Sequence, residues 1–262
     1  MERTKTGEFN WVDLSARDFE GQGAFYEALF GWSHTDVPFA EGMVYRMFSS
    51  DGHTVGGMSL LSPDMIEQGQ PSSWNTYVAT DDIDATAAKA AELGGTVVMP
   101  PMDVTGFGRM AAVQDPTGAH LFFWKPLRSD DSMAYGGPGR LSWNDLTTRD
   151  PEAAVDFYAK LLDWDIQPMT GLEQPYWQVS IDGEGEGGIM PMPEMVPAEV
   201  PAFWMPYFGT TDVVASVAKA KELGATVQAE PTQVGDMLVF AVLADPAGAT
   251  FALLQPFGAP GM

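Results

Sequence analysis

One stretch of sequence occurs twice in this chain. Residues 10–32 read NWVDLSARDFEGQGAFYEALFGW, and residues 142–164 read SWNDLTTRDPEAAVDFYAKLLDW. Asp18 and Asp150 hold the same place in the two copies, at an offset of 132 residues (150 minus 18). Because similarity at a fixed spacing is typical of a repeated structural unit, the chain is predicted to be a tandem duplication.

A second motif confirms the repeat and sets its limits. Residues 115–119 read DPTGA and return as DPAGA at residues 245–249, at an offset of 130, so one short deletion separates the copies. Between the copies, residues 128–140 are polar and rich in glycine, with no periodic pattern to bury. We therefore expect two domains and a linker, at residues 8–126, 139–257 and 127–138.

Local patterns within each copy predict short strands and helices. Residues 9–15 alternate between two faces, which is typical of a strand. In the second copy, Asp150 before Pro151 supplies a capping carboxylate and an N-terminal proline to a helix. In the first copy, Gly94 ends the helix predicted at residues 82–93. The remaining elements of the first copy are predicted as strands at 44–49, 54–60, 75–79, 96–99, 110–113 and 119–124, with helices at 24–29 and 82–93. The second half of the first copy is itself predicted to be a βαβββ unit.

Two glycine pairs lie inside predicted strands, at Gly56-Gly57 and Gly187-Gly188. Glycine in the interior of a strand weakens pairing, so its presence usually marks a bulge or the close approach of a ligand or of backbone. A turn is predicted at Asp51-Gly52, directly before the first of these strands.

Taken together, these motifs resemble the vicinal oxygen chelate superfamily, which includes glyoxalase I, extradiol dioxygenases and bleomycin-resistance proteins. The resemblance rests on D-x6-FY-x4-GW, on WNTYVATDDIDA (74–85) and on GRMAAVQDPTGAHLFFW (108–124). It extends to tandem glyoxalase-like proteins often labelled "hydroxylase" or "antigen". The resemblance implies an α+β fold of two tandem domains, in which two βαβββ modules form an open curled sheet cup with helices outside.

The same resemblance implies where a metal would bind. Metal-dependent members place His and Glu side chains at four positions on the inner strands of the cup. Here those positions fall at Trp11, Gly57, Asn75 and Phe122 in the first copy, and at Trp143, Gly188, Met205 and Ala252 in the second. We therefore expect no metal and no cofactor. An off-pattern site built from His120, Asp13 and another carboxylate is the alternative.

Two carboxylates are candidates for chemistry. Asp13 and Asp145 follow Trp11 and Trp143 by two residues, so each is expected to point into its cup, where an aromatic environment would suit an acid or base. The alternative is that each is a structural ion-pair or hydrogen-bond partner. Arg109 is a candidate anchor for an anionic ligand group, or else forms a surface ion pair.

Aromatic and apolar side chains complete the candidate ligand site. Concave sites lined by aromatic rings with a few polar groups suit flat apolar ligands. Alternatively, the two tryptophans next to the candidate acids fill each cup as core residues. The candidate ligand-binding residues are Trp11, Asn75, Tyr77, Arg109, His120, Phe122, Trp124, Trp143, Met205 and Tyr207.

Charge and composition restrict the partners. The chain has 36 acidic and 13 basic residues, a formal charge of −23, which disfavours nucleic acid and anionic membranes as partners. It has no cysteine, which excludes disulfides and thiolate chemistry. The N-terminal sequence has no secretory signal pattern, so a cytoplasmic location is expected, as a monomer or homodimer.

These features favour a metal-independent glyoxalase-fold protein that binds a small aromatic or apolar organic molecule, in secondary metabolism or in resistance by sequestration. One alternative is a metal-free enzyme in which Asp13 or Asp145 acts as acid or base on a polyketide- or quinone-like substrate. Others are a divalent-metal lyase or dioxygenase, and a chain in which one copy is purely structural.

Overall fold

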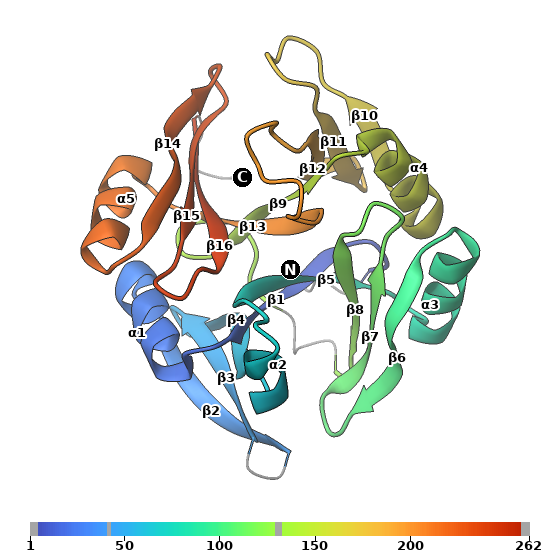
Figure 1. The fold of residues 1–262 in the computed structure, drawn as a ribbon, viewed down its shortest axis with the longest axis horizontal. Helices are drawn as coiled ribbons and strands as arrows, with labels where there is room; N and C mark the ends of the chain where they lie inside the picture. Colours follow the sequence, from blue (N-terminus) through green and yellow to red (C-terminus); the bar gives the residue numbers. More distant parts are fainter. Residues whose placement is uncertain (1–4, 41–42, 129–132, 258–262) are drawn as a thin grey trace. The chain divides into compact units, whose positions relative to one another are not determined.

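The structure, a computed structural model, describes residues 5–40, 43–128 and 133–257 (Figure 1). Its first repeat contains eight strands and three helices within these residues. In chain order they are β1 (Phe9–Ala16), α1 (Phe19–Phe30), β2 (Ser33–Ala40), β3 (Met43–Ser50), β4 (His53–Leu60), α2 (Pro63–Glu67), β5 (Ser73–Ala79), α3 (Ile83–Glu92), β6 (Thr96–Val104), β7 (Gly108–Gln114) and β8 (His120–Pro126).

The second repeat follows the same order. Its elements are β9 (Leu141–Thr148), α4 (Pro151–Leu162), β10 (Asp165–Pro168), β11 (Trp177–Ile181), β12 (Glu184–Pro191), β13 (Phe203–Gly209), α5 (Val213–Glu222), β14 (Thr226–Val234), β15 (Leu238–Ala244) and β16 (Thr250–Pro256). No counterpart of α2 lies among its described residues.

Each repeat contributes one eight-stranded sheet. The strand orders are β2-β3-β4-β1-β5-β8-β7-β6 and β10-β11-β12-β9-β13-β16-β15-β14, which become identical when the numbering is shifted by eight. In both sheets the first and fourth strands of each module pair in parallel. The second strand of each module pairs antiparallel with the third, and the third with the fourth. The predicted α+β class with two tandem glyoxalase-like domains is confirmed.

Helix ends follow the predicted chemistry. The Asp18 side chain accepts a hydrogen bond from the amide of Gly21, and the Asp150 side chain accepts one from Ala153. Asp51 and Gly52 both have positive φ, at 51° and 76°, as the predicted hairpin turn requires. The longest helices have 12 residues, and no helix in the described ranges is long and apolar enough to cross a bilayer.

Two strands and one helix of the first repeat differ from the prediction. β2 and α2 were not predicted, because the sequence SHTDVPFA of β2 has no apolar alternation and α2 has only five residues. β6 continues to Val104, beyond the predicted end at Met99. It passes through Pro100-Pro101, which an edge strand tolerates because it has one side without ladder partners.

The chain divides into two compact units, and each unit contains residues from both repeats. Unit 1 contains Asn144–Met205 and the segment that begins at Asn75, and unit 2 contains Val12–Trp74 and the segment that begins at Pro206. In each unit a first module of one repeat therefore packs against the second module of the other. Helix α1 contacts α5 within unit 2, and α3 contacts α4 within unit 1 (Figure 1).

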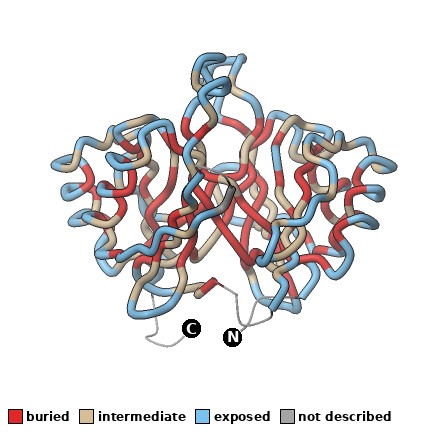
Figure 2. Tube along the Cα trace, turned by 90° about the horizontal axis from the view of Figure 1, so that it is seen from below, coloured by how far each residue is buried: buried red, intermediate tan, exposed pale blue. Residues whose placement is uncertain are grey.

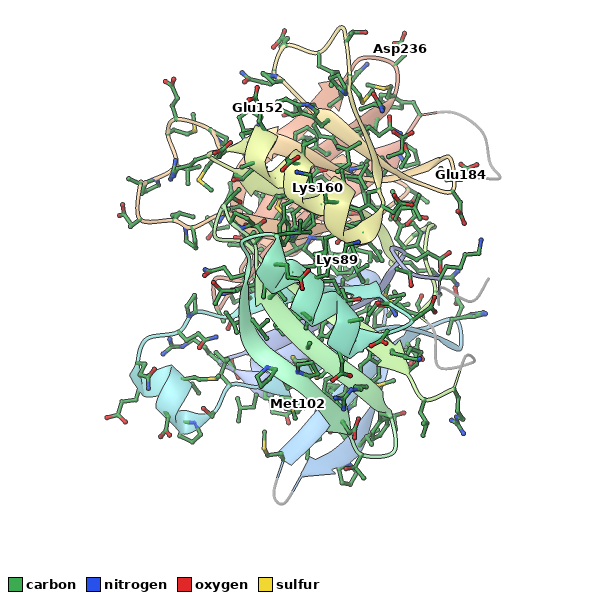
Figure 3. The ribbon with its side chains drawn as sticks, turned by 90° about the vertical axis from the view of Figure 1, so that its right-hand side faces the viewer. Lys89, Met102, Glu152, Lys160, Glu184 and Asp236 are labelled. Carbon is green, nitrogen blue, oxygen red and sulfur yellow. The ribbon has the colours of Figure 1, made fainter. Side chains whose placement is uncertain are left out.

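Contacts between these helices occur in matching pairs. Lys219 Nζ donates to the carbonyl of Leu29 at 3.1 Å in unit 2. Lys89 Nζ donates to the carbonyl of Leu161 at 3.1 Å in unit 1, where Figure 3 labels Lys89 near the boundary of α3 and α4. Each lysine thus satisfies a carbonyl in the last turn of a helix from the other repeat, which would otherwise lack an intrahelical partner.

A deeply buried tyrosine joins the two repeats in unit 2. The Tyr26 hydroxyl donates to Asp245 Oδ2 at 3.0 Å and accepts from the indole of Trp74 at 2.8 Å. Gln22 Nε2 donates to the same carboxylate oxygen at 2.6 Å. Burial, followed by the charge of Asp245, raises the pKa of Tyr26 well above 10, so this tyrosine is a neutral donor at all physiological pH values.

Unit 1 has the same arrangement with one donor fewer. The Tyr158 hydroxyl donates to Asp115 Oδ2 at 2.9 Å and accepts from the indole of Trp204 at 3.0 Å. Ala154 occupies the position of Gln22 and has no side-chain donor. We refer to Tyr26–Asp245 and Tyr158–Asp115 as the buried Tyr–Asp pairs. They explain why the DPTGA and DPAGA motifs recur, because each Asp also caps its own turn.

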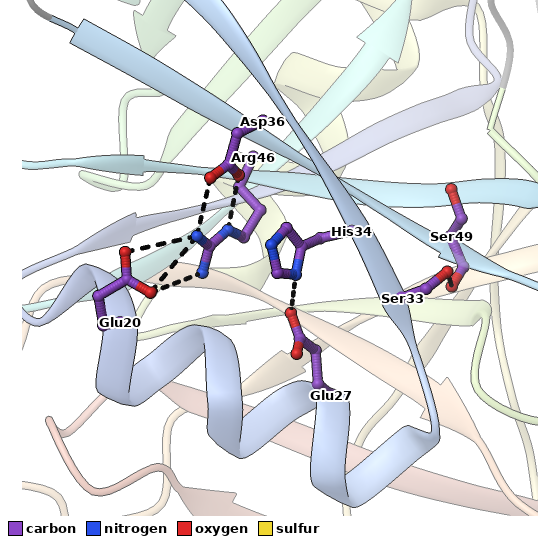
Figure 4. A network of polar contacts seen from close by, with 7 residues as sticks. All are labelled: Glu20, Glu27, Ser33, His34, Asp36, Arg46 and Ser49. Carbon is purple, nitrogen blue, oxygen red and sulfur yellow. Dashed lines mark hydrogen bonds and ion pairs between the residues drawn. The ribbon is translucent and has the colours of Figure 1, made fainter.

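The interior of the protein is largely made of strand residues (Figure 2). A basic side chain is also buried: Arg46 of β3 is 4% exposed and lies with its guanidinium carbon 4.5 Å from the centre of the Phe19 ring. Figure 4 shows its ion pairs with Asp36, at 2.8 Å, and Glu20, at 3.4 Å. Hydrogen bonding to Arg46 lowers the pKa of Asp36.

The predicted domain bounds at residues 8–126 and 139–257 stay a prediction. Part of the predicted linker, residues 129–132, lies outside the described residues. Its described part is anchored, since the amide of Ala134 donates to the Thr54 carbonyl at 2.8 Å and Met133 is buried. The indole of Trp32 further donates to the carbonyl of Gly139 at 2.8 Å.

Candidate functional site

The first candidate site is formed by three neighbouring strands of unit 2. Asp13 of β1 lies opposite Gly57 of β4 in a parallel pair. The hydroxyl of Tyr45, from β3, donates to Asp13 Oδ2 at 3.1 Å. Asp13 is 6% exposed, whereas Tyr45 as a whole residue is half-buried.

Gly57 is required by the position of that phenol. A Cβ atom on Gly57 would lie 2.1 Å from Tyr45 Oη and 2.4 Å from Cζ of the same ring, far inside van der Waals contact. The tyrosine ring therefore occupies the space into which a side chain at position 57 would extend. The glycine pairs predicted a bulge or a close approach by ligand or backbone, whereas the group that lies against Gly57 is a side chain.

The second repeat contains the same arrangement in unit 1. Asp145 of β9 lies opposite Gly188 of β12, and the hydroxyl of Tyr176 donates to Asp145 Oδ1 at 2.8 Å. A Cβ on Gly188 would lie 2.0 Å from Tyr176 Oη. We refer to Tyr45–Asp13 and Tyr176–Asp145 as the strand-face dyads. Their recurrence shows that the arrangement belongs to the module and not to one local sequence.

The residues at the four family ligand positions do not fit a divalent ion. The side chains of Trp11 and Phe122 have no atom that can ligate a metal ion. Gly57 has no side chain, and a phenol occupies the space beside it, so Asn75 alone offers one weak oxygen ligand. The second repeat offers Trp143, Gly188, Met205 and Ala252. Among the described residues no three His, Asp or Glu side chains gather as a metal-binding group.

The three histidines lie at separate places in the first repeat. His34 of β2 contacts Glu27 through its Nδ1 atom (Figure 4), and Nδ1 of His53 lies 3.0 Å from the carbonyl oxygen of Asp51. His120 is exposed at the start of β8. The alternative metal site, built from His120, Asp13 and another carboxylate, stays a prediction.

Some predicted aromatic residues are brought together. Tyr77 of β5 pairs with Phe122 of β8 in register, and their ring centres lie 4.8 Å apart. His120, Phe122 and Trp124 alternate along β8 with the buried Leu121 and Phe123. Trp124 also accepts a hydrogen bond at its carbonyl from Asn10.

In the second repeat the ring next to the tyrosine comes from a different strand. Tyr207 pairs with Ala252, and the nearby ring is that of Phe240 on β15, with ring centres 6.3 Å apart. Trp11, Tyr77, Met205 and Tyr207 are buried, between 5% and 8% exposed, while Trp143 and Asn75 are half-buried. The alternative in which the two tryptophans are core residues therefore describes Trp11 better than Trp143.

Arg109 is engaged on the surface of its own module. It forms ion pairs with Asp84 at 2.8 Å and Asp103 at 2.7 Å. These partners raise the pKa of Arg109, and hydrogen bonding to Arg109 lowers the pKa of Asp84. The ion-pair alternative thus accounts for this residue, because two carboxylates already neutralise the guanidinium. Its role as an anchor for an anionic ligand stays a prediction.

Sequence reasoning did not find Tyr45 or Tyr176. Both lie outside the motifs that define the repeat, and Tyr176 precedes its strand in a loop. Two signals were present: the residues match at an offset of 131 (176 minus 45), and each repeat has a glycine pair for which a partner group was expected. Phe240 was also missed, because its counterpart in the first repeat is Met110.

Comparisons with known proteins agree with this fold. The description "Glyoxalase/Bleomycin resistance protein/Dioxygenase superfamily" matches residues 8–123, and "Glyoxalase-like domain" matches residues 144–254. CFP32 of Mycobacterium tuberculosis is 38% identical over 256 residues, which cover 96% of each chain. Anthracycline biosynthesis protein DnrV of Streptomyces peucetius is 34% identical over 277 residues, covering 97% of this chain and 95% of its own. The chain belongs to the vicinal oxygen chelate superfamily.

Solved structures show the same fold at low identity. The Mn(II)-bound glyoxalase from Novosphingobium aromaticivorans has a TM-score of 0.66 at 15% identity, covering 96% of this chain and 84% of its own. The 2,3-dioxygenase LapB from Pseudomonas sp. KL28 has a TM-score of 0.64 at 12% identity, covering 98% and 95%. At such identities the likeness establishes the fold, and the activity must be argued from the site.

Proposed function

We propose that this protein binds a small, flat, largely aromatic organic molecule without a metal ion, at the strand faces that hold Asp13 and Asp145. The observation that carries the proposal is the phenol over each glycine. At the position where metal-dependent relatives would place a ligand side chain, this chain has a tyrosine hydroxyl bonded to a carboxylate.

The relatives agree with the proposed ligand class. DnrV and DauV are both named as anthracycline biosynthesis proteins, and each matches this chain over 97% of its length. Anthracyclines are flat aromatic molecules, a class that aromatic side chains contact well. We infer that the binding takes place in the cytoplasm and serves secondary metabolism or resistance by sequestration. The binding protein is a monomer or a homodimer, with no nucleic-acid partner.

A metal-free enzyme is the second candidate function, and one observation favours it. Each carboxylate is buried and holds a phenol in place, which is an arrangement that can move a proton to or from a bound substrate. In that case Asp13 or Asp145 acts as acid or base on a polyketide- or quinone-like substrate. Asp13→Asn and Asp145→Asn would then abolish most turnover, whereas a pure binder would keep its affinity for a neutral ligand within a few fold.

Native mass spectrometry tests the proposal directly. The protein is incubated with an extract of cells that produce aromatic polyketides, and bound metal and bound organic mass are recorded in one spectrum. The proposal predicts a metal-free adduct of a few hundred daltons, the size that such sites enclose. A stoichiometric divalent ion, retained with the organic molecule, would contradict it and support a lyase or dioxygenase.

A further inference from the structure

We propose that the rings of the ligand stack on one face of β7 and β8 in the first repeat, with the Trp124 indole as the central contact, and that the second repeat lacks this platform. β7 and β8 belong to the same eight-stranded sheet as β1. This inference rests on the proposed binding function and goes beyond it, because it names the residues that decide which repeat holds the rings. The ligand class it assigns is a planar molecule without a charged group.

Helix α3 distinguishes the two faces of β6, β7 and β8. It packs on one side of these strands (Figure 1), where Arg109 of β7 forms its ion pair with Asp84 of the helix. Because successive side chains of a strand point to opposite sides, Met110 lies on the side away from α3. Trp124 of β8 lies opposite Met110 in the register, and Phe122 precedes it by two residues, so both rings share that face.

The two repeats differ in the rings on this face. Phe122 and Trp124 are both half-buried, so part of each ring surface is exposed. The residues 130 positions later, at the same places of β16, are Ala252 and Leu254, which are 0% and 8% exposed. Large apolar side chains that stay partly exposed in one repeat only are typical of a recognition surface, because ordinary packing would bury them.

A glycine fixes the position of the indole. A Cβ atom on Gly108 of β7 would lie 2.6 Å from Cη2 and 2.9 Å from Cζ2 of Trp124, so the ring occupies the space of a side chain at position 108. The second repeat has Leu238 and Leu254 at these two places. The glycine and the indole therefore occur together, and a ring held at one place is what stacking on a planar ligand requires.

Methionines extend the platform across the sheet. Met110 lies opposite Trp124, and Met102 of the edge strand β6 lies opposite Met110, so the three side chains form one row. Met102 is 44% exposed. Thioether groups make favourable contacts with aromatic rings. The same row of the second repeat contains Thr232 and Phe240, with one ring and no sulfur.

Charge decides the class of ligand. The acidic and basic residues of β6, β7 and β8 are Asp103, Arg109 and Lys125. All three share the α3 side, because Arg109 lies opposite both Asp103 and Lys125 in the register. The face that carries Trp124 has no such side chain within these strands. A charged ligand group would lose hydration there without gaining a counter-charge, so the platform favours an uncharged planar molecule.

Exchange of Trp124 for its counterpart tests this inference. The probe 2,6-dihydroxyanthraquinone is titrated calorimetrically into the wild type and into Trp124→Leu, below the pKa of its hydroxyl groups. We expect one tight site per chain in the wild type. Trp124→Leu should bind about tenfold more weakly, because it loses a stacked ring. Trp124→Phe keeps a ring and should lose less than Trp124→Leu.

The second repeat supplies the matched control. Leu254→Val changes the residue at the same place of β16 and should leave the affinity for the probe unchanged. Thermal denaturation followed by circular dichroism verifies that each variant is folded. Wild-type affinity in Trp124→Leu would overturn the inference and leave the binding function standing.

Methionine methyl signals give an independent readout. In protein labelled with ¹³C-methyl methionine, ring currents of the bound probe should shift the signals of Met102 and Met110. Met237 of the second repeat is 42% exposed, close to the 44% of Met102, and its signal should stay in place. Weaker binding of Trp124→Leu without these shifts in the wild type would mean that the indole acts from a distance, and would also overturn the inference. If the wild type does not bind the probe at all, both the inference and the proposed function fail for this ligand class.

Discussion

The two kinds of Tyr–Asp pair in this protein use the same chemical groups for different purposes. In the buried Tyr–Asp pairs, Tyr26 and Tyr158 are fully buried and also accept a hydrogen bond from a tryptophan. In the strand-face dyads, Tyr45 and Tyr176 are half-buried and lie over a glycine. The comparison teaches that the same pair of side chains can be fully buried or reach the surface of a module, depending on what surrounds the tyrosine.

The largest expected effect comes from separating the repeats. Because each compact unit combines modules from both repeats, residues 1–138 and 139–262 made as separate chains would each lose half of both units. We expect neither chain alone to unfold cooperatively, and we expect an equimolar mixture to regain a single transition. Thermal denaturation followed by circular dichroism measures this, and two separately stable halves would contradict the division into units.

Next in size is the loss of a hydroxyl from a buried pair. Tyr158→Phe leaves Asp115 Oδ2 and the Trp204 indole without this partner, which should cost about 2 kcal/mol of unfolding free energy. Tyr26→Phe should cost about half as much, since Gln22 still donates to Asp245. Urea denaturation measures both. Adding Gln22→Ala should raise the cost beyond that of Tyr26→Phe alone, since Gln22 also accepts hydrogen bonds from Arg17, Asp18 and Ser72. Equal costs of Tyr26→Phe and Tyr158→Phe would contradict the account.

A smaller effect is expected at the strand-face dyads. A Cβ at Gly57 would overlap the ring of Tyr45, so Gly57→Ala should displace that ring, break its bond to Asp13 and cost about 1 kcal/mol. Tyr45→Ala removes the ring and makes room for the new methyl group. The two substitutions should therefore be strongly non-additive, as a double-mutant cycle of urea denaturation would show, while simple additivity would contradict the close approach.

The smallest effect concerns pH. Hydrogen bonding to Arg46 lowers the pKa of Asp36 in the folded protein, so this group contributes stability above its unfolded pKa, about 3.9, and loses it as the pH falls through the folded value. We expect the stability of the wild type to fall in that acidic window and that of Asp36→Asn to fall less steeply. Denaturation between pH 2 and 6 measures the difference, and parallel curves would contradict it.

Much of the fold could be predicted because it depends on local chemistry. Asp150-Pro151 fixes a helix start, Asp51-Gly52 fixes a turn, and the repeated motifs fix the order of strands. β2 could not be predicted, since it is an edge strand whose polar sequence has no buried face to reveal it. The pairing of modules from different repeats also leaves no local pattern, because it depends on contacts such as Tyr158 with Asp115.

The candidate site was predictable only in part. Asp13 and Asp145 stand out because they alternate with a tryptophan on a buried strand, and the glycine pairs indicated that something lies against them. The identity of that group required the structure, since Tyr45 and Tyr176 reach their carboxylates from strands and loops that follow no repeat motif.

Metal independence at the strand-face dyads is the central claim, and one titration tests it most directly. 2,6-Dihydroxyanthraquinone is titrated calorimetrically into the protein in the presence of a chelator, and again with excess Mn²⁺. The account predicts the same dissociation constant in both experiments. Binding that appears only when Mn²⁺ is supplied would contradict it.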